Sequence, residues 1–157
     1  MTIIRFISLI NESNPKLVYV DEELIIENTD KAIKIVTKKT KTELIDYTVA
    51  PIFMEGKSKG AHEWIIEFIR MPDEMERFCR ILDERLRSVN SDYDAKRYHN
   101  MVLNEPVIHL VKKGTFDKWL DSIGKLGGQN KVPRLSNDRV ILEQILELIE
   151  VKTNEHV

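Results

Sequence analysis

The strongest pattern in the chain is a helical stripe of apolar residues between positions 72 and 90. These residues recur at the spacing of one helix face: Met75, Phe78, Cys79, Leu82, Leu86 and Val89. Pro72 suits a first helical turn, and Asp73 and Glu74 suit the positive end of the helix dipole. Because such a helix buries only one face, it needs a second layer to pack on, and the neighbouring segments are typical of strands.

Five runs rich in β-branched and aromatic residues predict strands: residues 3–9, 16–20, 44–54, 62–71 and 106–114. Turn-forming residues between positions 11 and 15 separate the first two runs. The third and fourth runs flank a short loop with two glycines and are typical of an antiparallel pair. Alternation along the fourth run puts Trp64, Ile66 and Phe68 on one face of the sheet.

Four further segments predict helices: residues 27–39, 91–101, 115–124 and a last segment that begins after position 135. We expect Thr115 to cap the third of these and Gly124 to end it. Ser136 or Asn137 can cap the last one, which carries an apolar stripe: Ile141, Leu142, Ile145, Leu146 and Ile149. Residues 1–157 therefore predict a single small α+β domain, with a mostly antiparallel β-sheet and α-helices packed on it.

Composition limits the class of protein. A chain of 157 residues, 42% of them hydrophobic, is long enough to bury a core that needs no metal or disulfide. The 24 lysines and arginines against 26 acidic residues leave a net charge of −2, whereas dedicated nucleic-acid binders are usually basic. No apolar run approaches the roughly 18 residues of a membrane helix. With Cys79 interpreted as a small buried hydrophobe, we expect a cytoplasmic protein that binds neither nucleic acid nor a membrane.

The motifs of several common catalytic centres do not occur in the sequence. The four histidines lack the spacing of metal ligands, so we expect no metal site. There is no Gly-x-Ser-x-Gly elbow to expose a nucleophilic serine. There is also no glycine-rich phosphate loop of the GxxxxGK[ST] type, so we do not expect the chain alone to bind ATP tightly.

One loop nevertheless carries a candidate cation. Gly124, Gly127 and Gly128 lead into Lys131, and Pro133 follows two residues later. A lysine in such a turn can project from a rigid platform and meet a phosphate or a developing negative charge. From this pattern alone, an ordinary connecting loop with a solvated lysine is the competing interpretation.

A second basic feature is the lysine stripe at positions 31, 34, 38 and 41, which follows helical spacing in the first predicted helix. A stripe of this kind can meet a phosphate-bearing ligand or nucleic acid. It is also typical of a solvated helix face, which is the simpler interpretation.

Several blocks of the sequence resemble a known family. The blocks GTFDKW at 114–119 and GKLGGQNKVPRLSNDR at 124–139 resemble the C-terminal domain of the auxin-responsive acyl acid amido synthetases, especially the bacterial members. Four earlier blocks agree in the same order: DEELIIENTDKAI at 21–33, DYTVAP at 46–51, HEWIIEF at 62–68 and NSDYDAKRY at 90–98. The resemblance runs from about residue 21 to the end of the chain.

The resemblance implies adenylate-forming chemistry. Such enzymes activate a carboxylic acid with ATP, release pyrophosphate and pass the acyl group to an amino acid, while a small C-terminal domain swings over a large N-terminal one. In the matching Gln-x-Lys-x-Pro-Arg pattern, Lys131 is the expected catalytic residue that contacts the phosphates of ATP or of the acyl-adenylate. Gln129 and Arg134 are expected either to contact the same ligand or to shape the turn and dock the lid. Asn90, Tyr93 and Arg97 are expected to stabilise a helix corner.

Two departures from the family pattern leave an alternative open. The large adenylation domain is absent from the sequence, so we expect it as a partner in cis or in trans, with ATP and Mg bound only in the complete enzyme and no cofactor in the isolated chain. The family's short hinge with Gly and Arg is replaced by SNPKLVYV at 13–20. The alternative is a noncatalytic binding or regulatory module derived from the lid, for which self-association through exposed apolar surface is an option.

Overall fold

The computed structural model of the protein describes residues 4–9, 17–22, 25–54, 57–100 and 102–154. The turn expected between the first two strands lies outside these residues. The elements follow in this order: β1 (Ile4–Leu9), β2 (Leu17–Glu22), α1 (Ile26–Thr40), β3 (Glu43–Ile52), β4 (Ala61–Arg70), α2 (Met75–Val89), α3 (Ser91–Arg97), the short 3₁₀ helix η1 (Tyr98–Asn100), β5 (Val107–Lys112), α4 (Thr115–Ser122) and α5 (Val140–Asn154).

The described strands form two sheets. β1 and β2 make an antiparallel hairpin, and β3, β4 and β5 make a three-stranded sheet in that order. β3 and β4 are antiparallel, as expected, with Val49 opposite Trp64. β5 runs parallel to β4, with Trp64 opposite Ile108, so the sheet is mixed where we expected a mostly antiparallel one. The reason is the connection: α2 and α3 lie between the two strands, and a long helical crossover returns a strand in the same direction.

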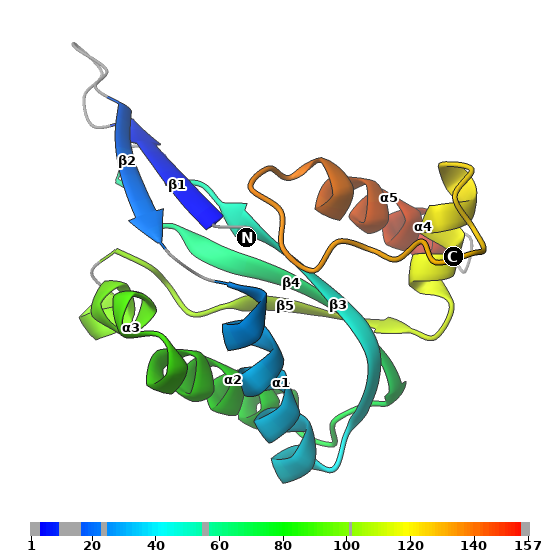
Figure 1. The fold of residues 1–157 in the computed structure, drawn as a ribbon, viewed down its shortest axis with the longest axis horizontal. Coiled ribbons are helices and arrows are strands. Elements are labelled where there is room, and N and C mark those ends of the chain that lie inside the picture. Colours follow the sequence, from blue (N-terminus) through cyan, green and yellow to red (C-terminus); the bar gives the residue numbers. More distant parts are fainter. Residues whose placement is uncertain (1–3, 10–16, 23–24, 55–56, 101, 155–157) are drawn as a thin grey trace.

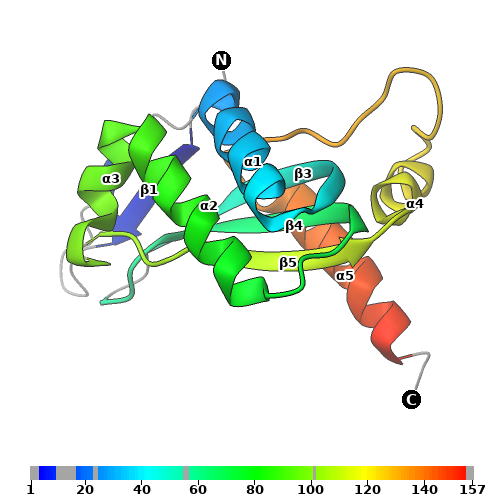
Figure 2. The same cartoon turned by 90° about the horizontal axis from the view of Figure 1, so that it is seen from below.

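Helices cover both faces of the three-stranded sheet (Figure 1). α1, α2 and α3 lie on one side, and α4 and α5 lie on the other, as the view from below also shows (Figure 2). The α+β fold class predicted from the sequence is therefore confirmed, with the sheet as the middle of three layers. None of the described helices has the length and hydrophobicity that crossing a membrane requires.

Alternation along β4 divides the buried residues into two cores. Trp64, Ile66 and Phe68 all belong to the core under α1 and α2, which confirms that they share one face of the sheet. Ile65 points the other way and packs with the residues of α4 and α5. We call these the α1/α2 core and the α4/α5 core.

Helix α2 has the apolar face that its sequence predicts. Phe78, Leu82 and Leu86 are buried in the α1/α2 core. Cys79 is only partly buried rather than fully so, and this burial raises the pKa of its thiol above the usual range. The free cysteine thus lies at the edge of the helix's apolar face.

Three helix starts differ from the sequence expectation. α2 begins at Met75 rather than at Pro72, with Glu74 in an extended conformation before it. α4 begins with Thr115 in the first turn, and the left-handed Gly114 precedes it as the cap. α5 begins at Val140, whose backbone N–H donates to the Asp138 carboxylate, so neither expected cap residue serves this helix. For α2 and α4 the residue before the helix has a non-helical backbone conformation, and residue propensity alone does not predict such boundaries.

The corner between α2 and α3 is held by a buried ion pair. Arg97 donates from Nε to Asp83 Oδ1 at 2.8 Å and from Nη2 to Asp83 Oδ2 at 2.5 Å. Tyr93 donates its hydroxyl to the same Oδ1 at 2.7 Å, and the Asn90 side chain accepts from the Tyr93 backbone N–H at 2.9 Å. The hydrogen bonds to Asp83 raise the pKa of Arg97, although burial opposes this. The predicted role of Asn90, Tyr93 and Arg97 at this corner is confirmed.

We expect Arg97→Met to lower the free energy of unfolding by about 3–5 kcal/mol, because it leaves the buried Asp83 carboxylate without its cation. The free energy is measured by urea unfolding of the whole chain. Arg80→Met changes an exposed arginine of α2, the helix that carries Asp83, and serves as the control. A loss below about 1 kcal/mol for Arg97→Met would mean that the pair is as weak as an exposed salt bridge.

Candidate functional site

The loop that carries Lys131 begins where α4 ends. Gly124 has a φ of 71°, a left-handed conformation that a glycine adopts without steric cost. Its N–H donates to the Asp121 carbonyl at 3.0 Å, and the Lys125 N–H donates to the Leu120 carbonyl at 2.8 Å. This pair of bonds is the Schellman motif, which closes a helix C-terminus. The prediction that α4 ends near Gly124 is therefore confirmed.

A glycine turn then reverses the chain before Lys131. Gly127 and Gly128 have φ values of 99° and 66°, which other residues rarely adopt. The Asn130 side chain donates to the Gly127 carbonyl at 3.3 Å and closes the turn. Gln129 is exposed within it.

Residues after Lys131 are fixed to the central sheet. The Thr48 hydroxyl donates to the Pro133 carbonyl at 2.6 Å. The Val49 N–H donates to the Arg134 carbonyl at 2.8 Å, and the Val49 carbonyl accepts from the Ser136 N–H at 3.0 Å. The loop thus pairs with β3 in the manner of a short parallel strand.

Two apolar side chains anchor the same stretch on opposite sides. Val132 is buried in the α4/α5 core, and Leu135 is buried in the α1/α2 core, each with 4% of its surface exposed. Lys131 itself is exposed. Lys131 thus lies directly before a segment whose main chain is fixed to the sheet. Its exposure fits both interpretations of the sequence, the lysine on a rigid platform and the solvated lysine of a connecting loop.

The Arg134 side chain is held by carboxylates from two elements. Nη1 donates to Asp30 Oδ1 at 3.1 Å and to Asp30 Oδ2 at 3.0 Å, while Nε donates to Asp46 Oδ1 at 3.2 Å. The guanidinium carbon lies 5.5 Å from the centre of the Tyr47 ring, within range of a cation–π contact. Burial acts to lower the pKa of Arg134, but the hydrogen bond and charge of Asp46 and the charge of Asp30 outweigh it and raise the pKa.

Tyr47 ties these carboxylates into the α1/α2 core. Its ring is buried, and its hydroxyl donates to Asp30 Oδ1 at 2.5 Å and lies 2.6 Å from the Thr29 hydroxyl. Burial, together with the hydrogen bond to Asp30, raises the pKa of Tyr47 well above its usual range, so the phenol stays protonated. A neutral hydroxyl donor therefore fixes Asp30 for Arg134.

A second arginine anchors the far end of the loop. Arg139 donates from Nη2 to Glu63 Oε2 at 2.7 Å, from Nη1 to the Pro51 carbonyl at 2.9 Å and from Nε to Glu143 Oε1 at 3.0 Å. Glu63 is buried, and its Oε1 lies 2.9 Å from His109 Nε2. The hydrogen bond with His109, followed by that with Arg139, lowers the pKa of Glu63 despite the opposing effect of burial.

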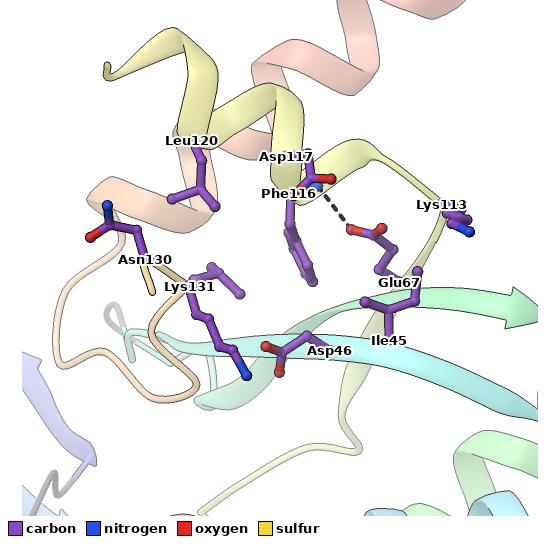
Figure 3. A pocket seen from close by; sticks show the side chains of 10 residues that line it. Ile45, Asp46, Glu67, Lys113, Phe116, Asp117, Leu120, Asn130 and Lys131 are labelled. Carbon is purple, nitrogen blue, oxygen red and sulfur yellow. Dashed lines mark hydrogen bonds between the residues drawn. The ribbon is translucent and has the colours of Figure 1, made fainter. Parts of the chain in front are cut away.

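Lys131 lines a pocket of about 330 Å³ between the loop, α4 and the sheet. The described lining residues are Ile45, Asp46, Glu67, Lys113, Phe116, Asp117, Leu120, Asn130, Lys131 and Val132. In Figure 3 the Lys131 side chain extends toward Asp46. The Glu67 carboxylate is occupied, because it accepts from the Gly114 N–H at 2.7 Å and from the Phe116 N–H at 2.9 Å and so caps α4.

The structure separates the three residues that the sequence singled out. Lys131 lies at the pocket, whereas Gln129 and Arg134 are not among its described lining residues, and Arg134 is committed to Asp30 and Asp46. Among the described residues, no group of three or more histidine, cysteine or acidic side chains is placed to hold a metal ion. The lysines 31, 34, 38 and 41 are exposed, and Lys31 pairs with Glu27 at 2.8 Å.

Sequence reasoning did not single out Asp30 and Asp46. Both lie inside blocks that resemble the family, DEELIIENTDKAI and DYTVAP, but such a resemblance indicates relatedness and not which side chains meet. The sequence did offer one signal for this cluster: two of the blocks contain an acidic residue, and a third contains the arginine, Arg134. The three residues meet only in the folded chain, across 104 and 88 positions of sequence.

Glu63→Gln tests the second anchor through pH. Because the pKa of Glu63 is lowered from its ordinary 4.5, its charge stabilises the fold above that pH, and this contribution is lost as the pH falls through the lower folded value. Glu63→Gln is expected to cost about 1.5–3 kcal/mol at pH 7 and to make urea unfolding less sensitive to acid.

Glu143→Gln is the matched control, since Glu143 contacts the same guanidinium from an exposed position. It is expected to change the free energy of unfolding by less than about 1 kcal/mol. Equal effects of the two substitutions would show that burial of Glu63 adds nothing to the anchor.

Comparison with known proteins agrees with this architecture. The profile of the GH3 family C-terminal domain matches residues 27–140. Indole-3-acetic acid-amido synthetase GH3.10 of Arabidopsis thaliana is 27% identical over 117 residues, which are 73% of this chain and 19% of that protein. Among solved structures, the GH3.15 acyl acid amido synthetase superposes with a TM-score of 0.62 at 20% identity, over 80% of this chain and 24% of that one.

A second structure, AtGH3.15 acyl acid amido synthetase in complex with 2,4-DB, gives a TM-score of 0.56 at 20% identity, over 85% of this chain and 27% of that one. The chain thus spans about a quarter or less of the length of these relatives. The match over residues 27–140 covers both the anchored loop and the strands that hold it. The family expected from the sequence blocks is confirmed: the chain belongs to the GH3 family, in which it corresponds to the C-terminal domain.

Proposed function

We propose that the chain is the mobile C-terminal lid of an ATP-dependent acyl acid amido synthetase. The observation that supports this most is the position of Lys131, an exposed lysine on a main chain that is fixed to β3 within the stretch matched by the family profile. The large domain that binds the acid and the nucleotide is then supplied in cis or in trans. We expect that domain, rather than this one, to hold ATP and Mg.

In the first half-reaction, a carboxylate oxygen attacks the α-phosphorus of ATP and the bond to pyrophosphate breaks. Negative charge concentrates on the phosphoryl oxygens as this occurs. An ammonium delivered by closure of the lid stabilises that charge, because a preorganised cation in a water-poor site interacts more strongly than one in bulk water. We assign this role to Lys131.

In the second half-reaction, the amine of an amino acid attacks the acyl carbon and AMP leaves, giving an amide. Here a cation held at the phosphate is no longer needed. A lysine on a separate small domain suits this sequence of events, since the domain can withdraw it between the two steps. The apolar side chains Ile123 and Leu126, exposed beside the loop, are available for contact with the large domain.

The proposal is tested on the native gene product that carries this chain, tagged and purified gently from its own cells. The eluate is assayed for ATP–pyrophosphate exchange that depends on an added carboxylic acid. We expect exchange activity, together with a large adenylation domain on the same chain or on a co-purifying one. A protein that purifies without such a domain and without exchange would contradict the proposal and favour a noncatalytic binding or regulatory module.

Lys131→Ala is expected to lower the exchange rate about 10²–10³-fold, because it removes a charge that acts only in the transition state. Lys125→Ala removes an exposed lysine from the same loop and is expected to stay within about twofold of the wild type. Exchange is measured with the same preparation as above. An active wild type with an unaffected Lys131→Ala variant would remove Lys131 from the mechanism.

A further inference from the structure

We propose that Arg134 is the positioning residue of this site, and that Asp30 and Asp46 act on Lys131 through it. The effect of Arg134 on catalysis rests on the proposed function. Its effect on the fixing of the loop does not. Arg134 lies three residues after Lys131, and its side chain forms an ion pair between the loop and α1, beside the apolar contact that Leu135 makes with the α1/α2 core. The resting place of the lysine then depends on a carboxylate in a different element of the fold.

The geometry requires a guanidinium. Nη1 contacts both oxygens of Asp30 at 3.1 and 3.0 Å, while Nε contacts Asp46 at 3.2 Å and the planar group lies over Tyr47. Arginine has several donors in a rigid planar fork, whereas lysine presents a single compact ammonium. A lysine at this position keeps the charge but cannot satisfy two carboxylates from α1 and β3 in the same way.

The coupling from Arg134 to Lys131 is short and stiff. Val132 between them is buried, and Pro133 has a fixed φ and a carbonyl bonded to Thr48. The Arg134 carbonyl accepts from the Val49 N–H, so the side chain and the main chain of Arg134 are both tied to the sheet. Loss of the side-chain contacts weakens one of two ties and loosens the Lys131 platform without unfolding the domain.

Of the two carboxylates that hold Arg134, Asp30 is the better one to substitute in a test of this proposal. Asp46 lines the pocket together with Lys131, so its removal changes the charge around the lysine as well as the hold on Arg134. Asp30 is not among the described lining residues, and it is joined to Arg134 and Tyr47. An effect of Asp30→Asn on Lys131 therefore passes through Arg134 or through Tyr47 of β3, and Arg134→Lys, which leaves the hydrogen bond between Tyr47 and Asp30 in place, separates the two routes.

The first experiment measures amide hydrogen exchange in the whole chain. The reporters are the N–H groups of Val49 and Ser136, which join β3 to the loop. We expect Asp30→Asn and Arg134→Lys to speed exchange at these two amides about tenfold, while the amides in the middle of α2 and β4 are unchanged.

Glu27→Gln breaks an exposed ion pair in the first turn of the same helix, and it is expected to leave both reporter amides as in the wild type. We call the hold of Asp30 and Asp46 on the Arg134 side chain the clamp. Equal exchange in wild type and Asp30→Asn would overturn it. Faster exchange throughout the chain would also overturn it, since the cluster would then support global stability alone.

The second experiment measures pyrophosphate exchange with the native gene product. Asp30→Asn and Arg134→Lys are expected to lower kcat about tenfold, with KM for ATP within about twofold, because the lysine is misplaced while ground-state binding is kept. In a Lys131→Ala background the same substitutions are expected to have no further effect. A rise in KM for ATP with Arg134→Lys, or an additional loss in the Lys131→Ala background, would assign Arg134 to the ligand instead and overturn the proposal.

The two experiments separate the failure of this inference from the failure of the proposed function. If the wild type shows no exchange activity, the proposed function fails, and with it the catalytic consequence of the clamp. The amide measurements then still support or overturn the clamp as a device that fixes the loop. If the wild type is active and the amides respond as expected but kcat does not, the positioning role is wrong.

Discussion

The attachment of one loop to the third strand is the constraint on which the rest of the candidate site depends. Val49 pairs with the loop through both its N–H and its carbonyl, and Thr48 bonds the Pro133 carbonyl beside it. Each bond fixes main chain rather than a flexible side chain. A lysine just before such a segment keeps its own rotamer freedom while the main chain that follows it is held in place, and the role that we propose for Lys131 requires this combination.

The layered fold provides this attachment because the loop crosses the edge of the sheet between two cores. Val132 enters the α4/α5 core and Leu135 enters the α1/α2 core, so the loop joins both helical layers to β3. The charged anchors follow the same plan. Arg134 reaches the α1 side, and Arg139 reaches Glu63 on the face that carries α5. Each arginine forms ion pairs with carboxylates from other elements of the fold. The partly buried acids therefore do not carry an unpaired charge, which would destabilise the fold.

Sequence periodicity predicted the elements whose burial is one-sided and was wrong where a distant contact decides the outcome. The stripe of α2 and the shared face of Trp64, Ile66 and Phe68 follow from local spacing. The direction of β5 does not, because alternation is the same in either orientation and only the crossover sets it. Lys131 was predicted from its glycine and proline neighbours and from the family resemblance, and its catalytic role stays a prediction. The partners of Arg134, Asp30 and Asp46, were not predicted, since nothing local reports a pairing across 88 or more residues.

The central claim is that Lys131 is delivered to a phosphate by closure of this domain. The most direct measurement is a structure of the native gene product, complete with its large domain, bound to a non-reactive acyl-adenylate analogue. The account predicts the Lys131 ammonium within hydrogen-bonding distance of the analogue's phosphate oxygens, with Arg134 still held by Asp30 and Asp46. A closed complex in which Lys131 stays in solvent while another residue contacts the phosphate would contradict it.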